Sequence, residues 1–167
     1  MGIVTSDLMT TNVVTLTPEM DLIQMDTVLF KRGVSGAPVL EGRSLVGVAS
    51  QFDLVRTLWE GEHDLHKRHV PDFSSPYPIP LSAIEAMSTE GPGVMERLKS
   101  LRVADIMTRD PILARPDDSL EVVANRMVDD QVHRLPVVEE CTGELVGVIS
   151  TLDVVAAIRR YGLAIEW

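Results

Sequence analysis

The sequence predicts a mixed α/β (α+β) fold in which tandem β-α-β-β-α repeats pack with pseudo-twofold symmetry. Two observations predict it: an internal duplication that spans most of the chain, and hydrophobic patterns that switch between strand and helix periods within each copy. We expect a first repeat over residues 1–60, a linker over 61–100 and a second repeat over 101–167, with both repeats forming one module. The hydrophobic content of 45% is sufficient for a core, which aliphatic side chains must fill because aromatic residues make up only 4%.

The duplication is visible as a series of matches in the same order. The segment Asp-Leu-Met-Thr at residues 7–10 matches Asp-Ile-Met-Thr at residues 105–108. Further along, a Pro-Val pair recurs, as does an apolar run that ends in serine; these matches are Pro38-Val39 with Pro136-Val137 and Leu45–Ser50 with Leu145–Ser150. Because one such unit is too small to bury its own faces well, we expect the two copies to share a core.

The elements of the first copy follow from local patterns. The β-branched run at residues 13–16 predicts a strand, and Thr17-Pro18 predicts a helix N-cap followed by proline at the first helical position. Apolar residues at helical spacing predict the buried face of that helix, which Asp26 interrupts and Gly33 ends; they are Leu22, Met25, Leu29 and Phe30. Two apolar runs around a polar turn at residues 41–44 predict a hairpin, after which a final helix begins near Gln51.

The second copy repeats this pattern with a stronger first helix. Its predicted buried face is Leu120, Val123, Ala124, Met127 and Val128. The final helix is apolar over residues 154–158, which is more than one face needs, and this surplus predicts packing against a second chain in a homodimer. In the linker, the prolines between residues 71 and 80 predict an extended loop, and residues 81–87 and 94–101 predict short helices.

Charge and composition exclude several classes of function. The formal net charge of -10 argues against nucleic acid as a partner, because phosphate backbones require clustered Lys and Arg. No apolar run reaches the length of a membrane span, and no leader pattern opens the chain, so we expect no membrane insertion and a cytoplasmic location. The single cysteine, Cys141, cannot form an internal disulfide, which agrees with a reducing compartment.

The sharpest chemical feature is a Gly-x-x-Ser-x-x-Asp turn that occurs at residues 47–53 and again at 147–153. Each turn joins the end of a strand to the start of a helix, where serine and an acidic residue three positions later form a capping box. The same geometry also fits a nucleotide. Helix N–H groups and the serine hydroxyl would donate to a phosphate, and the carboxylate would accept both hydroxyls of a ribose. Both interpretations, cap and nucleotide site, stay open at this point.

At these residues the sequence resembles a CBS domain pair, also called a Bateman module. The resemblance covers both repeats and leaves out the linker. It implies that the Ser and Asp of each turn bind the phosphate and ribose of an adenosine ligand; these residues are Ser50, Asp53, Ser150 and Asp153. It also implies an adenine pocket in each copy, made by Val13, Val14, Ala37 and Pro38 in the first and by Pro111, Ile112, Leu135 and Pro136 in the second.

The two copies differ just ahead of the Pro-Val segment. The second copy has His133-Arg134, where the first has Ser35-Gly36. The resemblance implies that basic residues at this point reach ligand phosphates, and Arg134 offers a bidentate, permanently charged donor. The alternative is a solvated turn in which the basic pair contacts Asp129 or Asp130. With the first interpretation, the two clefts are unequal.

The resemblance implies a regulatory module that binds AMP, ADP, ATP or S-adenosylmethionine and signals the ligand state to an unidentified protein partner by a conformational shift. The alternative is a ligand-free interaction module that regulates a redox protein, a transporter or an enzyme. We expect no enzymatic activity and no required cofactor, because the sequence carries no nucleophile-base-acid set, no NTPase phosphate loop and no Cys/His zinc framework. The linker histidines His63, His66 and His69 are interpreted as a solvated stretch rather than a metal site.

Overall fold

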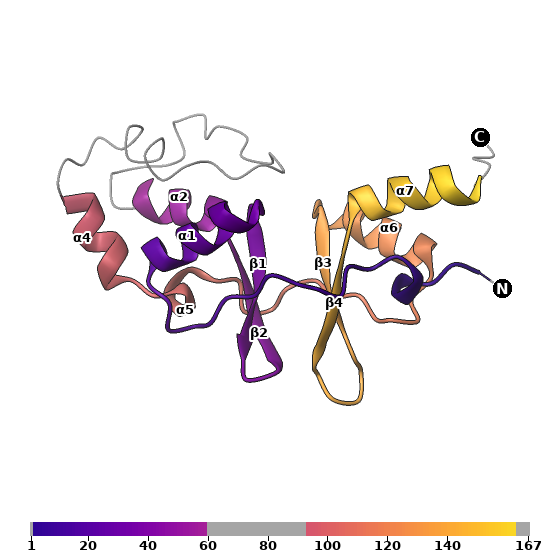
Figure 1. Ribbon diagram of the computed structural model, residues 1–167, viewed down its shortest axis with the longest axis horizontal. Helices are drawn as coiled ribbons and strands as arrows, with labels where there is room; N and C mark the ends of the chain where they lie inside the picture. The colour runs from indigo at the N-terminus through magenta and orange to yellow at the C-terminus, as the bar shows by residue number, and fades with distance from the viewer. Residues whose placement is uncertain (1, 60–92, 163–167) are drawn as a thin grey trace. The chain divides into compact units, whose positions relative to one another are not determined.

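The computed structural model describes residues 2–59 and 93–162, and the chain forms two compact units (Figure 1). Unit 1 comprises Met1–Val13, Gly42–Leu45 and Asp110–Trp167, and unit 2 comprises Val14–Glu41 and Val46–Arg109. Each unit therefore combines the hairpin and helices of one repeat with the opening segment of the other repeat.

Unit 2 holds the elements of the first repeat together with one helix at the end of the linker and one helix that follows it. They are α1 (Leu22–Arg32), β1 (Gly36–Glu41), most of β2 (Ser44–Ser50), α2 (Gln51–Trp59), α4 (Gly93–Ser100) and α5 (Val103–Ile106). Strands β1 and β2 form a two-stranded sheet, and α1 ends at Gly33 in the left-handed conformation, with φ of 67°. The hairpin, the glycine end and the helix at Gln51 all agree with the sequence patterns.

Unit 1 repeats this arrangement. A short 3-10 helix η1 (Thr5–Asp7) precedes α6 (Leu120–Asp129), β3 (Arg134–Val138), β4 (Leu145–Ser150) and α7 (Thr151–Tyr161). Strands β3 and β4 are antiparallel, with Arg134 opposite Ser150 and Pro136 opposite Val148. The predicted mixed α+β class, built from paired hairpins and helices, is confirmed.

The helix start predicted at Thr17-Pro18 is wrong. The N-cap of α1 is Asp21, whose side chain accepts a hydrogen bond from the Gln24 amide at 2.8 Å, and the Gln24 side chain accepts one from the Asp21 amide at 3.1 Å. Thr17 instead closes a turn, because its carbonyl accepts from the Met20 amide. The capping box at residues 21–24 thus places the helix one turn later than the proline suggested.

The predicted opening strand of each copy shrinks to a single bridge. Leu16 pairs in parallel with Val39, and Ala114 pairs in parallel with Val137. The Leu16 amide donates to the Pro38 carbonyl, and the Leu40 amide donates to the Leu16 carbonyl. A longer ladder would need the next donor to be the amide of Pro38, and proline has none. Pro136 limits the second copy in the same way.

Each unit has its own hydrophobic core. The unit 2 core is formed by twelve buried residues that come from every one of its elements; they are Leu16, Leu22, Met25, Leu29, Ala37, Val39, Ala49, Leu54, Val55, Leu98, Val103 and Ile106. The unit 1 core is smaller and contains Ala114, Val123, Met127, Leu135, Val137 and Ile149. Two residues predicted for the buried helix faces, Phe30 and Val128, are exposed, so each helix buries a narrower stripe than its apolar content suggests.

The glycine of each repeated turn permits a close approach by the opening segment of the other repeat. A Cβ on Gly47 would lie 2.7 Å from the Thr108 carbonyl oxygen, and a Cβ on Gly147 would lie 2.6 Å from the Met9 sulfur. Backbone hydrogen bonds hold these segments in place, with Val48 and Thr108 exchanging a pair at 3.0 and 2.9 Å. Gly47 and Gly147 are therefore required for close packing against these opening segments.

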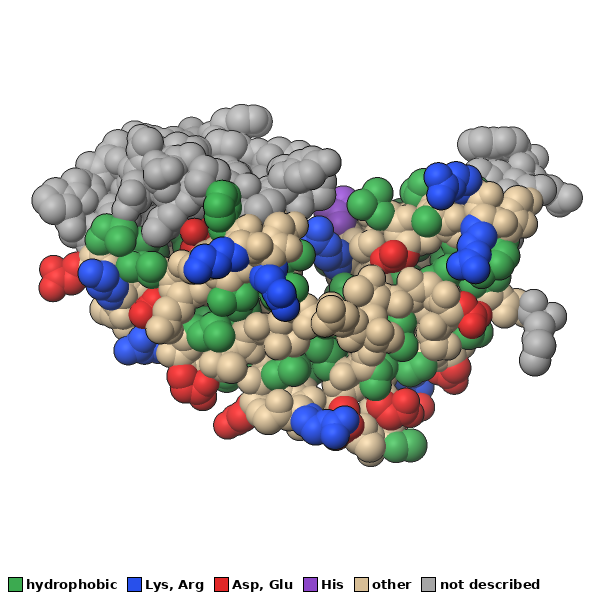
Figure 2. Space-filling model, in the orientation of Figure 1, with side chains coloured by type: hydrophobic (Ala, Val, Ile, Leu, Met, Phe, Trp, Pro, Cys, Tyr) green, Lys and Arg blue, Asp and Glu red, His purple; other side chains and the backbone are tan. Residues whose placement is uncertain are grey.

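Helix α4 matches the helix predicted over residues 94–101 and contributes Leu98 to the unit 2 core. In unit 2, Leu54 and Val55 of α2 are buried in the same core as Leu98 of α4. In unit 1, α7 leaves Leu152 69% and Val155 60% exposed, and Figure 2 shows hydrophobic side chains on the surface over this helix. The helix predicted at residues 81–87 and the loop at 71–80 lie outside the described residues.

Candidate functional site

The first repeated turn lies in unit 2, where Ser50 ends β2 and Gln51 begins α2. One oxygen of Asp53, Oδ2, accepts from the Ser50 amide at 2.8 Å and from the Ser50 hydroxyl at 2.7 Å. The Asp53 amide donates back to Ser50 Oγ at 3.4 Å. The capping box predicted from the spacing is therefore present.

The second turn, in unit 1, has the same geometry. Asp153 Oδ2 accepts from the Ser150 amide at 2.8 Å and from the Ser150 hydroxyl at 2.6 Å. The serine hydroxyl thus donates to the carboxylate of its own turn. What each turn can present to a ligand is the second carboxylate oxygen, Oδ1, at a helix N-terminus.

The two turns differ at this second oxygen. In unit 2, Arg56 Nη2 pairs with Asp53 Oδ1 at 3.0 Å. The corresponding residue in unit 1 is Ala156, and no side chain or backbone group among residues 2–59 and 93–162 donates to Asp153 Oδ1. One carboxylate is thus paired with a cation, and the other keeps an oxygen available.

The basic pair lies beside the second turn. Arg134 begins β3 directly opposite Ser150, and the His133 carbonyl accepts from the Thr151 amide at 3.0 Å. Arg134 is half-buried, and His133 is exposed. In unit 2 the matching place is Gly36, where a Cβ would lie 3.0 Å from the Ser50 Cβ. The second hairpin therefore places the basic residue Arg134 opposite Ser150. At the matching position beside Ser50, the first hairpin has Gly36, which has no side chain.

The residues expected to bind adenine belong largely to the hairpins and their cores. Ala37, Pro38, Leu135 and Pro136 are buried in β1 and β3. Val14 packs against the unit 2 core, whereas Val13 belongs to unit 1, so these two neighbours divide between the units. Pro111 is half-buried and Ile112 is exposed, both in unit 1. The candidate residues of the second copy thus all belong to unit 1, whereas the boundary between the units passes between Val13 and Val14 of the first.

A buried polar pair adjoins the first turn, and sequence patterns did not assign it a role. Gln51 Nε2 donates to Asp26 Oδ1 at 2.6 Å, and Asp26 is only 4% exposed. Burial raises the pKa of the Asp26 carboxyl above its usual value of 3.8, and the hydrogen bond from Gln51 partly offsets this. The signal was Asp26 itself, a carboxylate within an apolar helical stripe; the second copy has Ala124 and Thr151 instead.

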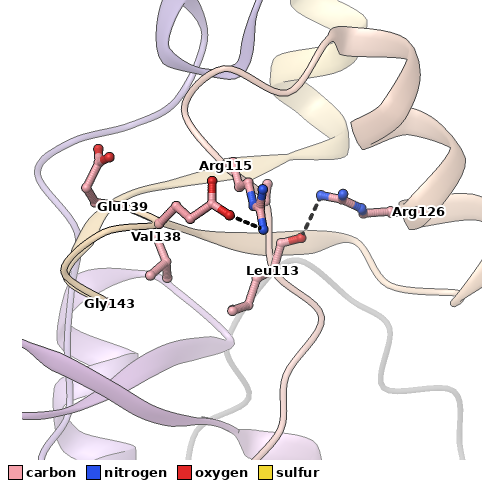
Figure 3. A pocket seen from close by; sticks show the side chains of 8 residues that line it. Leu113, Arg115, Arg126, Val138, Glu139 and Gly143 are labelled. Carbon is pink, nitrogen blue, oxygen red and sulfur yellow. Dashed lines mark hydrogen bonds and ion pairs between the residues drawn. The ribbon is translucent and has the colours of Figure 1, made fainter.

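A surface hollow of about 360 Å³ in unit 1 contains none of the predicted site residues (Figure 3). Two arginines line it. Arg115 pairs with Glu140 at 2.8 Å, and Arg126 donates to the Leu113 carbonyl at 3.0 Å and also pairs with Asp118. Because both cations contact carboxylates or carbonyl groups, the hollow offers balanced charge rather than an anion site.

Two features are absent from the part of the chain that the structure describes. Within those residues, no cluster of three His, Cys, Asp or Glu side chains is placed to hold a metal ion, and no helix has the length and apolarity to span a bilayer. Cys141 is an exposed free thiol. The linker histidines His63, His66 and His69 lie outside the described residues.

Two solved structures resemble the fold over nearly the whole chain. CBSX2 from Arabidopsis thaliana, solved in complex with AMP, aligns with a TM-score of 0.69 at 24% identity, covering 97% of this chain and 100% of that one. The CBS domain pair of MJ0100, solved with 5'-methylthioadenosine and S-adenosyl-L-methionine, aligns with a TM-score of 0.64 at 18% identity, covering 97% and 98%. These likenesses show a shared fold.

Sequence comparison gives the family. A protein of Methanocaldococcus jannaschii, the uncharacterized protein MJ1426, is 35% identical over 147 residues, which are 83% of this chain and 81% of that protein. The family profile of the CBS domain matches residues 4–60 and again residues 103–160, which is more than half of the chain. The chain therefore belongs to the CBS domain family and carries two copies of the domain.

Proposed function

We propose that the chain is a regulatory module that binds an adenosine ligand at its Ser-x-x-Asp turns and reports the ligand state to a protein partner. The observation that carries this proposal is the unit 1 turn, where Asp153 keeps one carboxylate oxygen available beside Arg134 and a helix N-terminus. Two structural neighbours support it, since CBSX2 was solved with AMP and MJ0100 with S-adenosyl-L-methionine and 5'-methylthioadenosine.

Each part of such a ligand has a matching group in unit 1. A ribose diol donates to the open oxygen of Asp153, as carboxylates accept from several donors at once. Arg134, next to Ser150, contacts the phosphate with a charge-assisted hydrogen bond. The half-buried Pro111 and the exposed Ile112 supply apolar surface for the base. The site needs a ligand with a base, a diol and preferably an anion, which describes AMP, ADP or ATP more closely than S-adenosylmethionine.

The unit 2 turn would bind the same ligand with fewer contacts. Ser50 and Asp53 would contact the sugar, and Val14, Ala37 and Pro38 would supply apolar surface, but Gly36 provides no cation. Signalling requires that the ligand bind two conformations with different affinity, because equal affinity shifts no population. No cofactor is required, and the regulatory ligand itself carries the signal.

A ligand-free interaction module is the second candidate, and one observation favours it. At both turns the serine hydroxyl and the carboxylate already satisfy each other, as a helix cap alone requires. In this case the partner, such as a redox protein, a transporter or an enzyme, binds irrespective of nucleotide. The double variant Asp53→Ala with Asp153→Ala separates the two candidates. If the variant binds the partner as the parent chain does, and nucleotide does not change that binding, the ligand-free interaction module is favoured.

We also propose a homodimer that forms through α7 and acts in the cytoplasm. The exposed Leu152 and Val155 supply apolar surface on which a second copy could pack, and the free thiol of Cys141 suits a reducing compartment. Sedimentation velocity should give a dimer, and Val155→Glu should give a monomer that still folds. A monomeric parent chain contradicts this assembly.

Thermal shift tests the binding proposal. Ligand-stripped chain is heated with AMP, ADP, ATP or S-adenosylmethionine, and a ligand that binds the folded state raises Tm by an amount that grows with the ratio of its concentration to its Kd. We expect at least one of the four to raise Tm, and the double variant Asp53→Ala with Asp153→Ala to remove the shift. Asp117→Ala, an exposed carboxylate away from the turns, is the matched control and should keep it. No shift with any of the four ligands contradicts the proposal.

A further inference from the structure

The two carboxylates of the repeated turns are held by the same serine contacts but differ in one partner. Asp53 and Asp153 each direct Oδ2 at the serine amide and hydroxyl. Among the described residues, a cation contacts the other oxygen of Asp53 only, from Arg56 at 3.0 Å in the next turn of α2. The difference follows from one position in the repeat, which is arginine at 56 and alanine at 156.

The hydroxyls of a ribose would donate to this second carboxylate oxygen, Oδ1. With Oδ2 occupied by two serine donors, the diol must bind chiefly through Oδ1 of either aspartate. In unit 1 the approach to Asp153 Oδ1 meets no donor from the described residues. In unit 2 the diol must displace the Arg56 guanidinium or share the oxygen with it.

We propose that Arg56 is a specificity-determining residue that weakens recognition of the ribose diol in unit 2. The proposal rests on the proposed function, because it concerns the same adenosine ligand at the same turns. Its consequence is an order of occupancy in which the unit 1 turn binds ribose first and the unit 2 turn binds at higher ligand concentration. The residue difference at positions 56 and 156 thus adds to the inequality that Arg134 and Gly36 already give the two turns.

The size of the effect follows from the exposure of the ion pair. The Arg56 side chain is 44% exposed and that of Asp53 is 11% exposed, so solvent screens the pair in part, and such an ion pair contributes modestly. Displacing it should weaken diol binding by about two- to fivefold. The effect is a modulation of affinity rather than a block, which is why a paired comparison is needed to measure it.

The experiment compares AMP with 2'-deoxy-AMP, because the ratio of their Kd values reports the diol contact while the base and phosphate contributions cancel. Two backgrounds isolate the turns: Asp53→Ala leaves the unit 1 turn, and Asp153→Ala leaves the unit 2 turn. Arg56→Ala is added to the second background and Ala156→Arg to the first. Ala156→Gln, which adds length without charge on an exposed position, is the matched control.

We expect the AMP preference over 2'-deoxy-AMP to be larger in the unit 1 background. Arg56→Ala should raise this preference in the unit 2 background by about two- to fivefold, and Ala156→Arg should lower it by a similar factor in unit 1, with Ala156→Gln unchanged. Measurable AMP binding with ratios that neither substitution moves overturns the role of Arg56 and leaves the proposed function standing. A unit 2 background that binds no AMP even with Arg56→Ala also overturns it. Absence of nucleotide binding by the parent chain overturns both proposals.

Discussion

Arg134 faces Ser150 directly across the β3–β4 ladder. The hairpin thus places Arg134 opposite the residue that precedes α7, a helix start where N–H groups and the macrodipole favour an anion. In unit 2 the place beside Ser50 belongs to Gly36, which is close-packed against that serine. The two turns share their caps but differ in the charge around them.

The Arg134–Ser150 relationship predicts a phosphate-dependent loss of affinity. Arg134→Ala should weaken AMP binding by about tenfold, the value of a charge-assisted hydrogen bond, while adenosine binding changes little. Calorimetric Kd values for AMP and adenosine measure this. Arg159→Ala, on the exposed surface of α7, is the control and should leave both affinities unchanged. Equal losses for AMP and adenosine would show that Arg134 supports the fold rather than the phosphate.

The close approach at the turn glycines predicts unequal costs of adding a methyl group. Gly47→Ala places Cβ against a backbone carbonyl at 2.7 Å, which cannot move easily, so we expect a loss of about 1–3 kcal/mol in the free energy of unfolding. Gly147→Ala meets the flexible Met9 side chain first and should cost less. Urea unfolding midpoints test the order, with Gly2→Ala as the control because nothing lies within 4 Å of its Cβ. A Gly47 variant as stable as the Gly2 variant contradicts this packing.

The buried Asp26 predicts a specific pH dependence of stability. Because burial raises its pKa in the folded state, the folded chain binds this proton more tightly than the unfolded chain does. The free energy of unfolding therefore falls as pH rises from the usual value of 3.8 through the raised pKa, and the full penalty persists above it.

Asp26→Asn removes that titration while keeping an acceptor for Gln51 Nε2. The variant should have a higher Tm than the parent at pH 7, and this advantage should shrink towards pH 4. Thermal unfolding across this range measures the difference between the two chains. Asp117→Asn, an exposed carboxylate, is the control. A constant difference at all pH values would show that the carboxylate does not titrate as its burial requires.

The helix cap predicts which of two neighbouring residues matters for α1. Asp21→Ala removes the acceptor for the Gln24 amide and should cost about 1 kcal/mol. Thr17→Ala should be close to neutral, because Thr17 is exposed and its backbone carbonyl alone closes the preceding turn. Unfolding midpoints of the two variants decide this, and a larger loss for Thr17→Ala contradicts the observed helix start.

The duplication, the hairpins and the helix starts at Gln51 and Thr151 could be predicted, because they depend on local turn chemistry and hydrophobic periodicity. The extent of the opening strands could not be predicted. Pro38 and Pro136 can accept a backbone hydrogen bond but cannot donate one, and the length of each strand depends on where these prolines fall in its pairing. Likewise, the composition of the compact units depends on tertiary contacts, such as Met9 against Gly147, between residues far apart in sequence.

The candidate site shows the same division. The spacing of Ser50 and Asp53 predicts their capping contact, and Arg134 could be selected as a difference between the copies. The pairing of Arg56 with Asp53 was open to prediction from their separation of three residues along a helix. The Asp26–Gln51 pair was not, because its members lie on different helices and only the packing of α1 against the start of α2 brings them together.

Isothermal titration calorimetry of the ligand-stripped full chain with AMP tests the central claim most directly. The account predicts saturable heat, with the tighter binding lost in Asp153→Ala and the weaker binding lost in Asp53→Ala. S-adenosylmethionine, titrated in the same way, establishes whether the site prefers a phosphate or a sulfonium group. Absence of heat and of any thermal shift with AMP, ADP, ATP and S-adenosylmethionine would contradict the account and leave the two turns as helix caps alone.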